Sequence, residues 1–306
     1  MEHNNRNLKA RWIARLLFAA VAAIALAGCG SSSDRALSVL HQTFAGKHQV
    51  SSGNLAVLLS VAPSAAGGVK EPVTLGLAGP FQSRGWGRIP ASAFDVRLGA
   101  MGKNVAVTIT STGSSGYVTF RGQSYELPPA TFQRLESTFV RLSSVSAGGN
   151  GAGALARLGI DPERWLVSPQ IVGEEAISGT STTHIRAGVN VAALLSDVGT
   201  LLRRAASAGA TGARSLLPPA SRSRIAGQVK NPVVDVWSGV ADKTLRQLMI
   251  GLSVHGAAIR LTMRYSDLNQ PQTITAPTRL LPYRRFQDKL SGLLQDFAGG
   301  LTSATR

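Results

Sequence analysis

The fold signal is strongest in Leu248-Met-Ile-Gly-Leu-Ser-Val254 and Ile259-Arg-Leu-Thr-Met-Arg-Tyr265, which a turn at His255 to Ala258 joins. In both segments an apolar side chain occupies every second position. That is the period of a β-strand, whose successive side chains point to opposite faces. The stretch therefore predicts a pair of strands with one apolar face and, through Arg260 and Arg264, one basic face.

The same period of two recurs between Gln49 and Tyr125. Glycine-rich turns separate the segments at spacings too short for a helix to cross between parallel strands. We predict a meander of antiparallel strands here, and a further strand pair over residues 170–187 that turns at Gly179. The alternating positions are Leu55, Val57, Leu59, Val61, Val73, Leu75, Leu77, Phe94, Val96, Leu98, Val105, Val107, Ile109, Tyr117 and Thr119.

Other stretches have the helical period of about 3.6 residues, and they predict amphipathic helices. We expect Asp34 to cap the first of these helices and Gly46 to end it. Strands and helices together predict an α+β protein. Gly149 to Ala154 approximates a dinucleotide fingerprint, but no strand precedes it, so we interpret it as a linker. The apolar faces are Leu37, Leu40 and Phe44; Phe132, Leu135, Phe139 and Leu142; Val191, Leu194, Leu195, Val198, Leu201 and Leu202; and Phe286, Leu290, Leu293 and Phe297.

The amino end predicts where the protein works. Arg11 and Arg15 precede an uncharged apolar run, small residues and Cys29, which is the layout of a secretory signal peptide. The run is too short to span a bilayer, for which about 20 apolar residues are needed. Leu26-Ala-Gly-Cys29 resembles the bacterial lipobox. We therefore expect removal of residues 1–28, acylation of Cys29 and anchoring at the outer face of the cell membrane; the alternative is an inert, buried thiol.

The domain borders follow from this pattern. We expect residues 29–33 to form a tether, residues 34–282 to form one domain, and residues 283–306 to form a C-terminal amphipathic helix with its tail. The chain has a single cysteine, so no disulfide can form within it. The exported protein must therefore be stabilised by its hydrophobic core without a disulfide. A domain of this length can form a core of sufficient size.

The chain is strongly basic, with 32 Lys and Arg residues against 16 Asp and Glu. The signal peptide contains four of these bases, so the excess persists after its removal. Nucleic acid is not expected as a partner, because aromatic residues do not interleave with the basic ones. We interpret Arg203, Arg204, Arg222 and Arg224 as a patch that faces anionic lipid, each cation contributing about 1 kcal/mol. The alternative is an ordinary solvated surface.

Catalytic and metal-binding motifs are missing from the sequence. It has no Gly-x-Ser-x-Gly elbow and no His-Glu-x-x-His, and its cysteine is assigned to acylation. Glu174 and Glu175 are adjacent acids on a predicted strand, where neighbours point to opposite faces and cannot work together. We therefore expect a protein that is not an enzyme and that uses no cofactor or metal.

Three stretches resemble the LppX/LprG/LprA group of actinobacterial lipoproteins. They are Gly179-Thr-Ser-Thr-Thr-His184-Ile, the strand pair from Met249 to Tyr265, and Tyr265-Ser-Asp-Leu-Asn-Gln-Pro-Gln-Thr-Ile-Thr-Ala-Pro277. The likeness in layout covers residues 34 to 278 and implies a strongly curved antiparallel half-barrel with helices on its concave face, similar to the Lol lipoprotein carriers. Such a protein holds acyl chains in an apolar cavity without catalysis. The arginine-rich residues 203–230 and the helix after Pro282 depart from the family pattern.

The resemblance implies a monomeric, membrane-anchored lipoprotein that carries or presents a lipid or glycolipid in the cell envelope, with an envelope lipid transporter as a partner. Two alternatives are a scaffold or sensor of the same fold that binds a protein, and an envelope hydrolase. The expected cavity residues are Val105, Val107, Ile109, Leu194, Val198, Leu248, Ile250, Leu252, Val254, Ile259, Leu261 and Met263.

Overall fold

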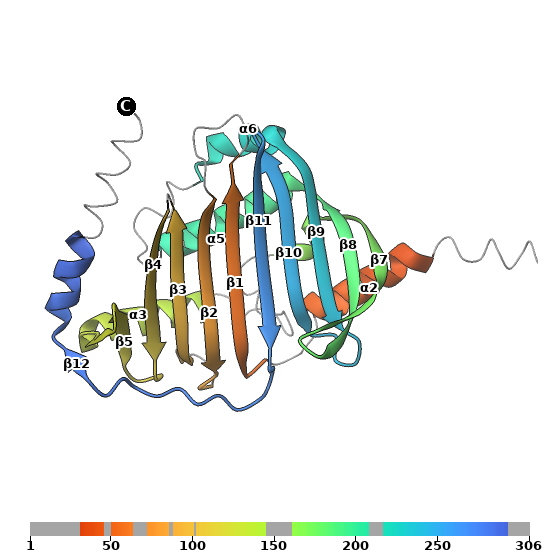
Figure 1. Ribbon diagram of the computed structural model, residues 1–306. Coiled ribbons are helices and arrows are strands. Elements are labelled where there is room, and N and C mark those ends of the chain that lie inside the picture. Colours follow the sequence, from red (N-terminus) through yellow and green to blue (C-terminus); the bar gives the residue numbers. More distant parts are fainter. Residues whose placement is uncertain are drawn as a thin grey trace, which may run out of the picture.

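The main feature of the fold is a large curled sheet, as a computed structural model shows (Figure 1). The structure describes residues 31–45, 50–63, 72–85, 88–100, 102–144, 161–207 and 217–292. Twelve strands of the described part belong to this sheet. They are β1 (Ser52–Ala62), β2 (Val73–Gln82), β3 (Ala91–Ala100), β4 (Lys103–Ser111), β5 (Gly116–Phe120), β6 (Gln123–Glu126), β7 (Leu166–Ile177), β8 (Thr180–Val189), β9 (Val229–Gly239), β10 (Leu245–Val254), β11 (Ala257–Ser266) and β12 (Leu280–Leu281).

The strand order is β12-β6-β5-β4-β3-β2-β1-β11-β10-β9-β8-β7. Two meanders, β1 to β6 and β7 to β11, meet where β1 pairs with β11. Every pairing is antiparallel except the short parallel contact of β12 with β6. The sheet curls without closing, which confirms the predicted antiparallel half-barrel and the predicted meander.

Helices lie over one face of this sheet. α2 (Ser31–Ala45), α3 (Pro129–Ser144) and α5 (Val191–Ser207) pass behind the strands in Figure 1, and α6 (Pro219–Gln228) lies at the ends of β10 and β11. A short 3-10 helix, η1 (Pro162–Trp165), precedes β7. The predicted packing of helices on the concave face is thus the observed arrangement.

The first helix packs by a narrower stripe than its sequence predicts. Ala36, Leu40 and Phe44 are buried at helical spacing, whereas Leu37 is 46% exposed. The helix begins at Ser31, inside the segment predicted to be a tether, and Asp34 lies in its first turn. An acid in the first turn is favourable there, because the N-terminal end of the helix dipole is positive.

Strand β9 is absent from the sequence-based prediction because Pro232 interrupts it. A proline cannot donate a hydrogen bond to a neighbouring strand, which argues against a central strand. The structure accommodates it with an irregularity: the pairing of β9 with β10 shifts between Gly251 and Ser253, and Asn231 has φ of 49°. The bulge moves Pro232 out of the ladder, and the strand continues on both sides.

The carboxyl-terminal part returns to the far end of the sheet. After β11 the chain runs beneath β1 to β4 to reach β12, and residues 283–292 form a helix beyond it (Figure 1). Phe286 of this helix is 7% exposed and contacts the rings of Phe120 and Tyr125. Residues 1–30, with the signal peptide and Cys29, lie outside the described residues, as do the predicted linker Gly149 to Ala154, Leu293 and Phe297.

Candidate functional site

Strand register aligns apolar side chains into two rows that cross the sheet. Residues directly opposite each other on neighbouring strands share one face, so each row lies on a single face. The first row, from β9 to β5, is Val236, Leu248, Met263, Val57, Leu77, Val96, Val107 and Phe120. The second row, from β9 to β4, is Val234, Ile250, Leu261, Leu59, Leu75, Leu98 and Val105.

Packed cores cover both ends of these rows. At one end, Leu40 and Phe44 of α2 pack against β8, β9 and β10, and we call this the α2 core. At the other end, Phe286 packs against Val118, Phe120, Tyr125 and Leu127, and we call this the C-terminal core. Because α2 lies on the same face as the rows, that face is the one the helices cover.

Between the two cores the rows remain partly exposed. Leu75 is 45% exposed and Leu98 is 36% exposed, although both lie on the face that α3 and α5 cross. Two apolar side chains of α3 are also open, Leu135 at 47% and Phe139 at 36%. We call the open middle of the rows the apolar strip; it consists of Leu59, Leu75, Leu77, Val96 and Leu98.

Helix α5 is held above the sheet by a buried polar contact at its side. Asp197 is 4% exposed and accepts hydrogen bonds from Trp165 Nε1 at 3.0 Å and from the Asp161 backbone N–H at 2.9 Å. The principal backbone neighbours of α5 are η1 and α6, and not a strand. A helix anchored in this way can lie over an apolar face without filling it. The sequence analysis did not identify this anchor, whose sequence signal is a lone acid within an apolar helix.

The structure divides the predicted cavity residues between different surroundings. Leu248 and Ile250 are buried in the α2 core, and Ile109 is 46% exposed near the C-terminal core. The rest are half-buried, apart from the buried Leu194. Leu252, Leu261 and Met263 pack against the α2 core, Val105 and Val107 against the C-terminal core, and Val198, Val254 and Ile259 lie outside both. The sheet positions therefore share one face, but the ends of that face are filled by protein.

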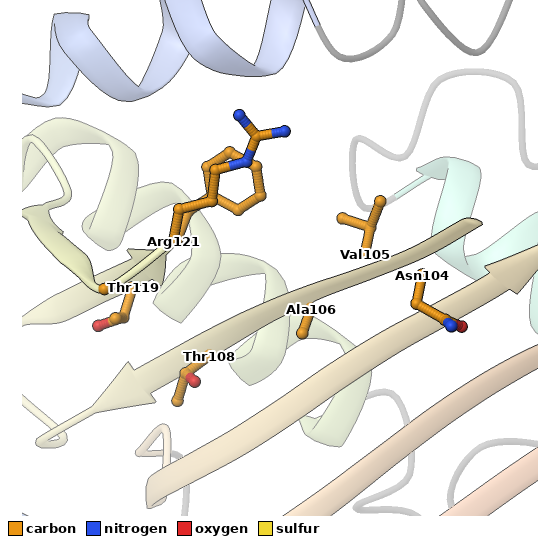
Figure 2. Close-up of a pocket in the computed structure, with 8 residues that line it drawn as sticks. Asn104, Val105, Ala106, Thr108, Thr119 and Arg121 are labelled. Atoms are coloured by element: carbon orange, nitrogen blue, oxygen red, sulfur yellow. The ribbon is translucent and has the colours of Figure 1, made fainter.

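A pocket of about 360 Å³ lies at the β4 end of this face, beside the C-terminal core (Figure 2). Of the predicted cavity residues, only Val105 lines it. The full lining is Asn104, Val105, Ala106, Thr108, Thr119, Phe120, Arg121 and Gly122.

Aromatic side chains form the other boundary of the apolar strip. The connector between β11 and β12, residues 267–279, fixes this boundary to the sheet. Tyr265 stands edge-on to Phe81 with ring centroids 6.4 Å apart, and burial raises the pKa of its hydroxyl above the ordinary value of 10.0. The connector is bound to β1: Asn269 accepts from the Ser51 N–H at 2.9 Å, and its own N–H donates to the Ser52 carbonyl. The family-like motif ending at Pro277 thus has a structural role, because it crosses the strand ends below the strip.

The opposite face carries a polar network around His184. Its Nε2 lies 2.7 Å from Asp235 Oδ1, and its Nδ1 lies 3.1 Å from Glu175 Oε1. Arg186 Nε also donates a hydrogen bond to Asp235 Oδ1 at 2.7 Å. The ring of Trp237 stacks on the imidazole, with the two ring centroids 4.3 Å apart. Because carboxylates engage both ring nitrogens, neither is free to activate a serine or water. The network joins β7, β8 and β9, a structural role that the sequence analysis did not identify.

The predicted basic patch is spread over α5 and α6. Arg203 and Arg224 are exposed, and Arg203 donates to Thr200 Oγ1 on its own helix at 2.8 Å. The guanidinium of Arg222 instead lies against Gly199 of α5, where an added Cβ would come within 2.4 Å of it. Arg222 therefore contributes to the packing of α6 on α5, and Arg204 is half-buried.

No group of three or more His, Cys, Asp or Glu side chains is placed to hold a metal ion in the ranges that the structure describes. Within the same ranges, each helix is too short or too polar to cross a bilayer.

No family model and no curated protein matches the sequence, but solved structures are similar to it in fold. LprF from Mycobacterium bovis is 15% identical over 81% of this chain and 99% of its own, with a TM-score of 0.46. The Mycobacterium tuberculosis lipoprotein LppX is 14% identical over 79% and 99% of the two chains, with a TM-score of 0.39. MucB of Pseudomonas aeruginosa, in a complex with MucA, is 8% identical over 77% of this chain and 56% of its own, with a TM-score of 0.28. LppX, after which the group that the sequence resembles is named, is thus among the solved structures that are similar in fold.

Proposed function

We propose that this protein binds the acyl chains of a lipid or glycolipid on the apolar strip and carries or presents that lipid in the cell envelope. The observation that carries the proposal is the exposure of Leu75 and Leu98, which lie in unbroken apolar rows on the face that the helices cover. A folded core would bury such residues. An apolar ligand lying there would complete the core.

The size of the apolar strip suits an acyl chain. Strands lie about 4.8 Å apart, so the strip on β1 to β3, continued by the half-buried Leu261 of β11, is about 14 Å long. Burial of each methylene contributes about 0.8 kcal/mol, so ten of them contribute about 8 kcal/mol before the costs of binding. The costs of binding reduce this gain, so the dissociation constant lies above the value of about 1 μM that 8 kcal/mol would give, which suits a reversible carrier.

Anchoring completes the proposed role. The lipobox-like residues before Cys29 support acylation of its thiol and attachment at the outer face of the cell membrane. Two acyl chains give stable attachment where one is marginal. The exposed Arg203 and Arg224 would then face anionic headgroups, and an envelope lipid transporter would exchange ligand with the protein. The proposal requires no catalysis, cofactor or metal.

Native mass spectrometry of the purified 30–306 fragment tests the proposal, since this fragment contains every described element. We expect a mass shift that disappears on delipidation and returns when a long-chain lipid is added. A fragment that is purified without lipid, and that does not bind a fluorescent fatty acid at 100 μM, would refute it.

A protein-binding role is the second candidate, and strand β7 favours it. This strand forms an edge of the sheet and exposes Val167 at 48% and Val172 at 56%. An open edge with apolar side chains can pair with an extended segment of another protein. Recovery of a stoichiometric envelope protein with the lipid-free fragment would support this role over lipid carriage.

A further inference from the structure

The pocket beside the C-terminal core arises from a difference in strand length. β4 runs from Lys103 to Ser111, but β5 pairs with it only from Val107 onward. The chain then turns through Arg121 and Gly122 into β6. Residues 103–106 are therefore paired with β3 on one side and have no β5 residue on the other. We call the resulting pocket the β4 notch (Figure 2).

The β4 notch connects the two faces of the sheet. Val105 belongs to the second apolar row, while Ala106 and Thr108 alternate to the polar face; Figure 2 shows them pointing in opposite directions. Phe120, which ends the first row, is 4% exposed and lines the same pocket. One end of the β4 notch is therefore apolar and continuous with the rows, and the other end is polar.

Arg121 provides the positive charge of the β4 notch. Its guanidinium lies 5.2 Å from the centroid of the Phe120 ring, and none of the acids in the described ranges forms an ion pair with it. Asp95 lies on β3, the strand beside β4, and it already has two partners. It accepts a hydrogen bond from Thr108 Oγ1 at 2.6 Å and forms an ion pair with Arg97 at 3.7 Å. The charge of Arg121 is thus available to a ligand.

The turn itself does not require an arginine. Arg121 has φ of 49° and Gly122 has φ of 73°, which is the two-residue hairpin turn that favours Asn-Gly. A long, charged side chain adopts positive φ less readily than asparagine does. An arginine at this tip is better explained by its position beside the pocket than by the turn.

We propose that the β4 notch holds the anionic headgroup of the bound lipid, with Arg121 pairing with its phosphate or carboxylate. The acyl chain would leave the notch past Val105 and run along Leu98 and Leu75 of the apolar strip. This inference rests on the proposed lipid binding and adds the ligand class, an anionic lipid, and its orientation. A volume of 360 Å³ is within the range of small-ligand pockets and leaves room for a headgroup.

Two lipids with identical acyl chains test the inference on the 30–306 fragment: fluorescent phosphatidic acid, which is anionic, and the matching neutral diacylglycerol. We expect Arg121→Ala to weaken binding of phosphatidic acid by about five- to tenfold, as expected for loss of one charge-assisted contact, and to leave diacylglycerol binding unchanged. Arg121→Lys should restore most of the affinity. The matched control is Arg260→Ala, which removes an exposed arginine from β11 on the polar face and should change neither affinity.

The outcomes separate the two proposals. If both lipids bind and Arg121→Ala weakens neither, or both equally, the headgroup site is overturned while lipid binding stands. If neither lipid binds the unmodified fragment, the proposed function fails and the headgroup site fails with it. Glycerol 3-phosphate without acyl chains should not compete at millimolar concentration. Competition by it would assign the notch to a free phosphate and overturn the lipid orientation.

Discussion

Replacement of Leu75 by tryptophan separates a ligand-binding strip from an ordinary core. Leu75 is 45% exposed between Leu59 and Leu98, whereas Ile250 of the same row is 8% exposed beneath α2. A larger side chain in a close-packed site costs about 1 to 3 kcal/mol, so Ile250→Trp serves as the control. For a domain of this size, 1 kcal/mol lowers the melting temperature by about 2 to 4 °C.

These magnitudes give opposite expectations for the two variants. Ile250→Trp should melt about 2 to 12 °C below the unmodified lipid-free fragment. Leu75→Trp should change the stability by no more than about 0.5 kcal/mol, because its ring enters open space. If that ring displaces four methylenes of the ligand at about 0.8 kcal/mol each, lipid affinity falls by about two orders of magnitude.

Circular dichroism melting of the delipidated variants and titration with a fluorescent fatty acid measure both quantities. The reasoning is refuted if Leu75→Trp melts as early as Ile250→Trp and binds fatty acid as well as the unmodified fragment does. The strip would then be filled protein core.

Four further changes test separate parts of the molecule. Cys29→Ser should block incorporation of labelled fatty acid and leave uncleaved precursor or shed protein; label that still enters the variant contradicts the anchor. Reversal of Arg203 and Arg224 to Glu should weaken binding of the 30–306 fragment to anionic vesicles, most clearly at low salt, where screening is least; unchanged binding would return these residues to an ordinary surface. Phe286→Ala should destabilise the protein by about 3 to 5 kcal/mol in urea unfolding, because the ring fills the C-terminal core; a loss below 1 kcal/mol would place that helix outside the fold. Burial raises the pKa of Tyr265, so the folded protein holds this proton above pH 10 while the unfolded chain releases it, and stability falls as the pH rises through that range. Tyr265→Phe should remove this part of the alkaline destabilisation, and equal pH dependence in both proteins would show that another group causes it.

Most of the fold could be predicted because the strands collect their apolar side chains on one face of the sheet. The alternation from Leu248 to Tyr265 fixed a strand pair, and the short glycine-rich turns between Gln49 and Tyr125 fixed an antiparallel meander, since no helix fits between such segments. The prediction failed at β9, where Pro232 obscured the pattern. A single bulge at Asn231 was enough to keep the strand in the sheet, and local propensity does not reveal such a bulge.

The candidate site could be predicted less well. Alternation identified the apolar face, but it could not show which part of that face another element covers. Leu248 and Ile250 gave the strongest pattern, yet α2 packs over them, while Leu75 and Leu98 stay open. No sequence pattern indicated Arg121 as a site residue, because its position beside a pocket follows from the shorter length of β5.

The sequence by itself determined the strand period, the amphipathic helices, the lipobox-like amino end and the excess of positive charge. These are properties of neighbours along the chain, so composition and spacing are sufficient to specify them. The tertiary structure alone decided that β1 pairs with β11, which joins two meanders into one sheet, and that the apolar residues of eight strands fall into register. It also decided that cores close both ends of those rows while the middle stays open. Such properties depend on contacts between residues as distant in sequence as Val57 and Met263, and no local pattern encodes them.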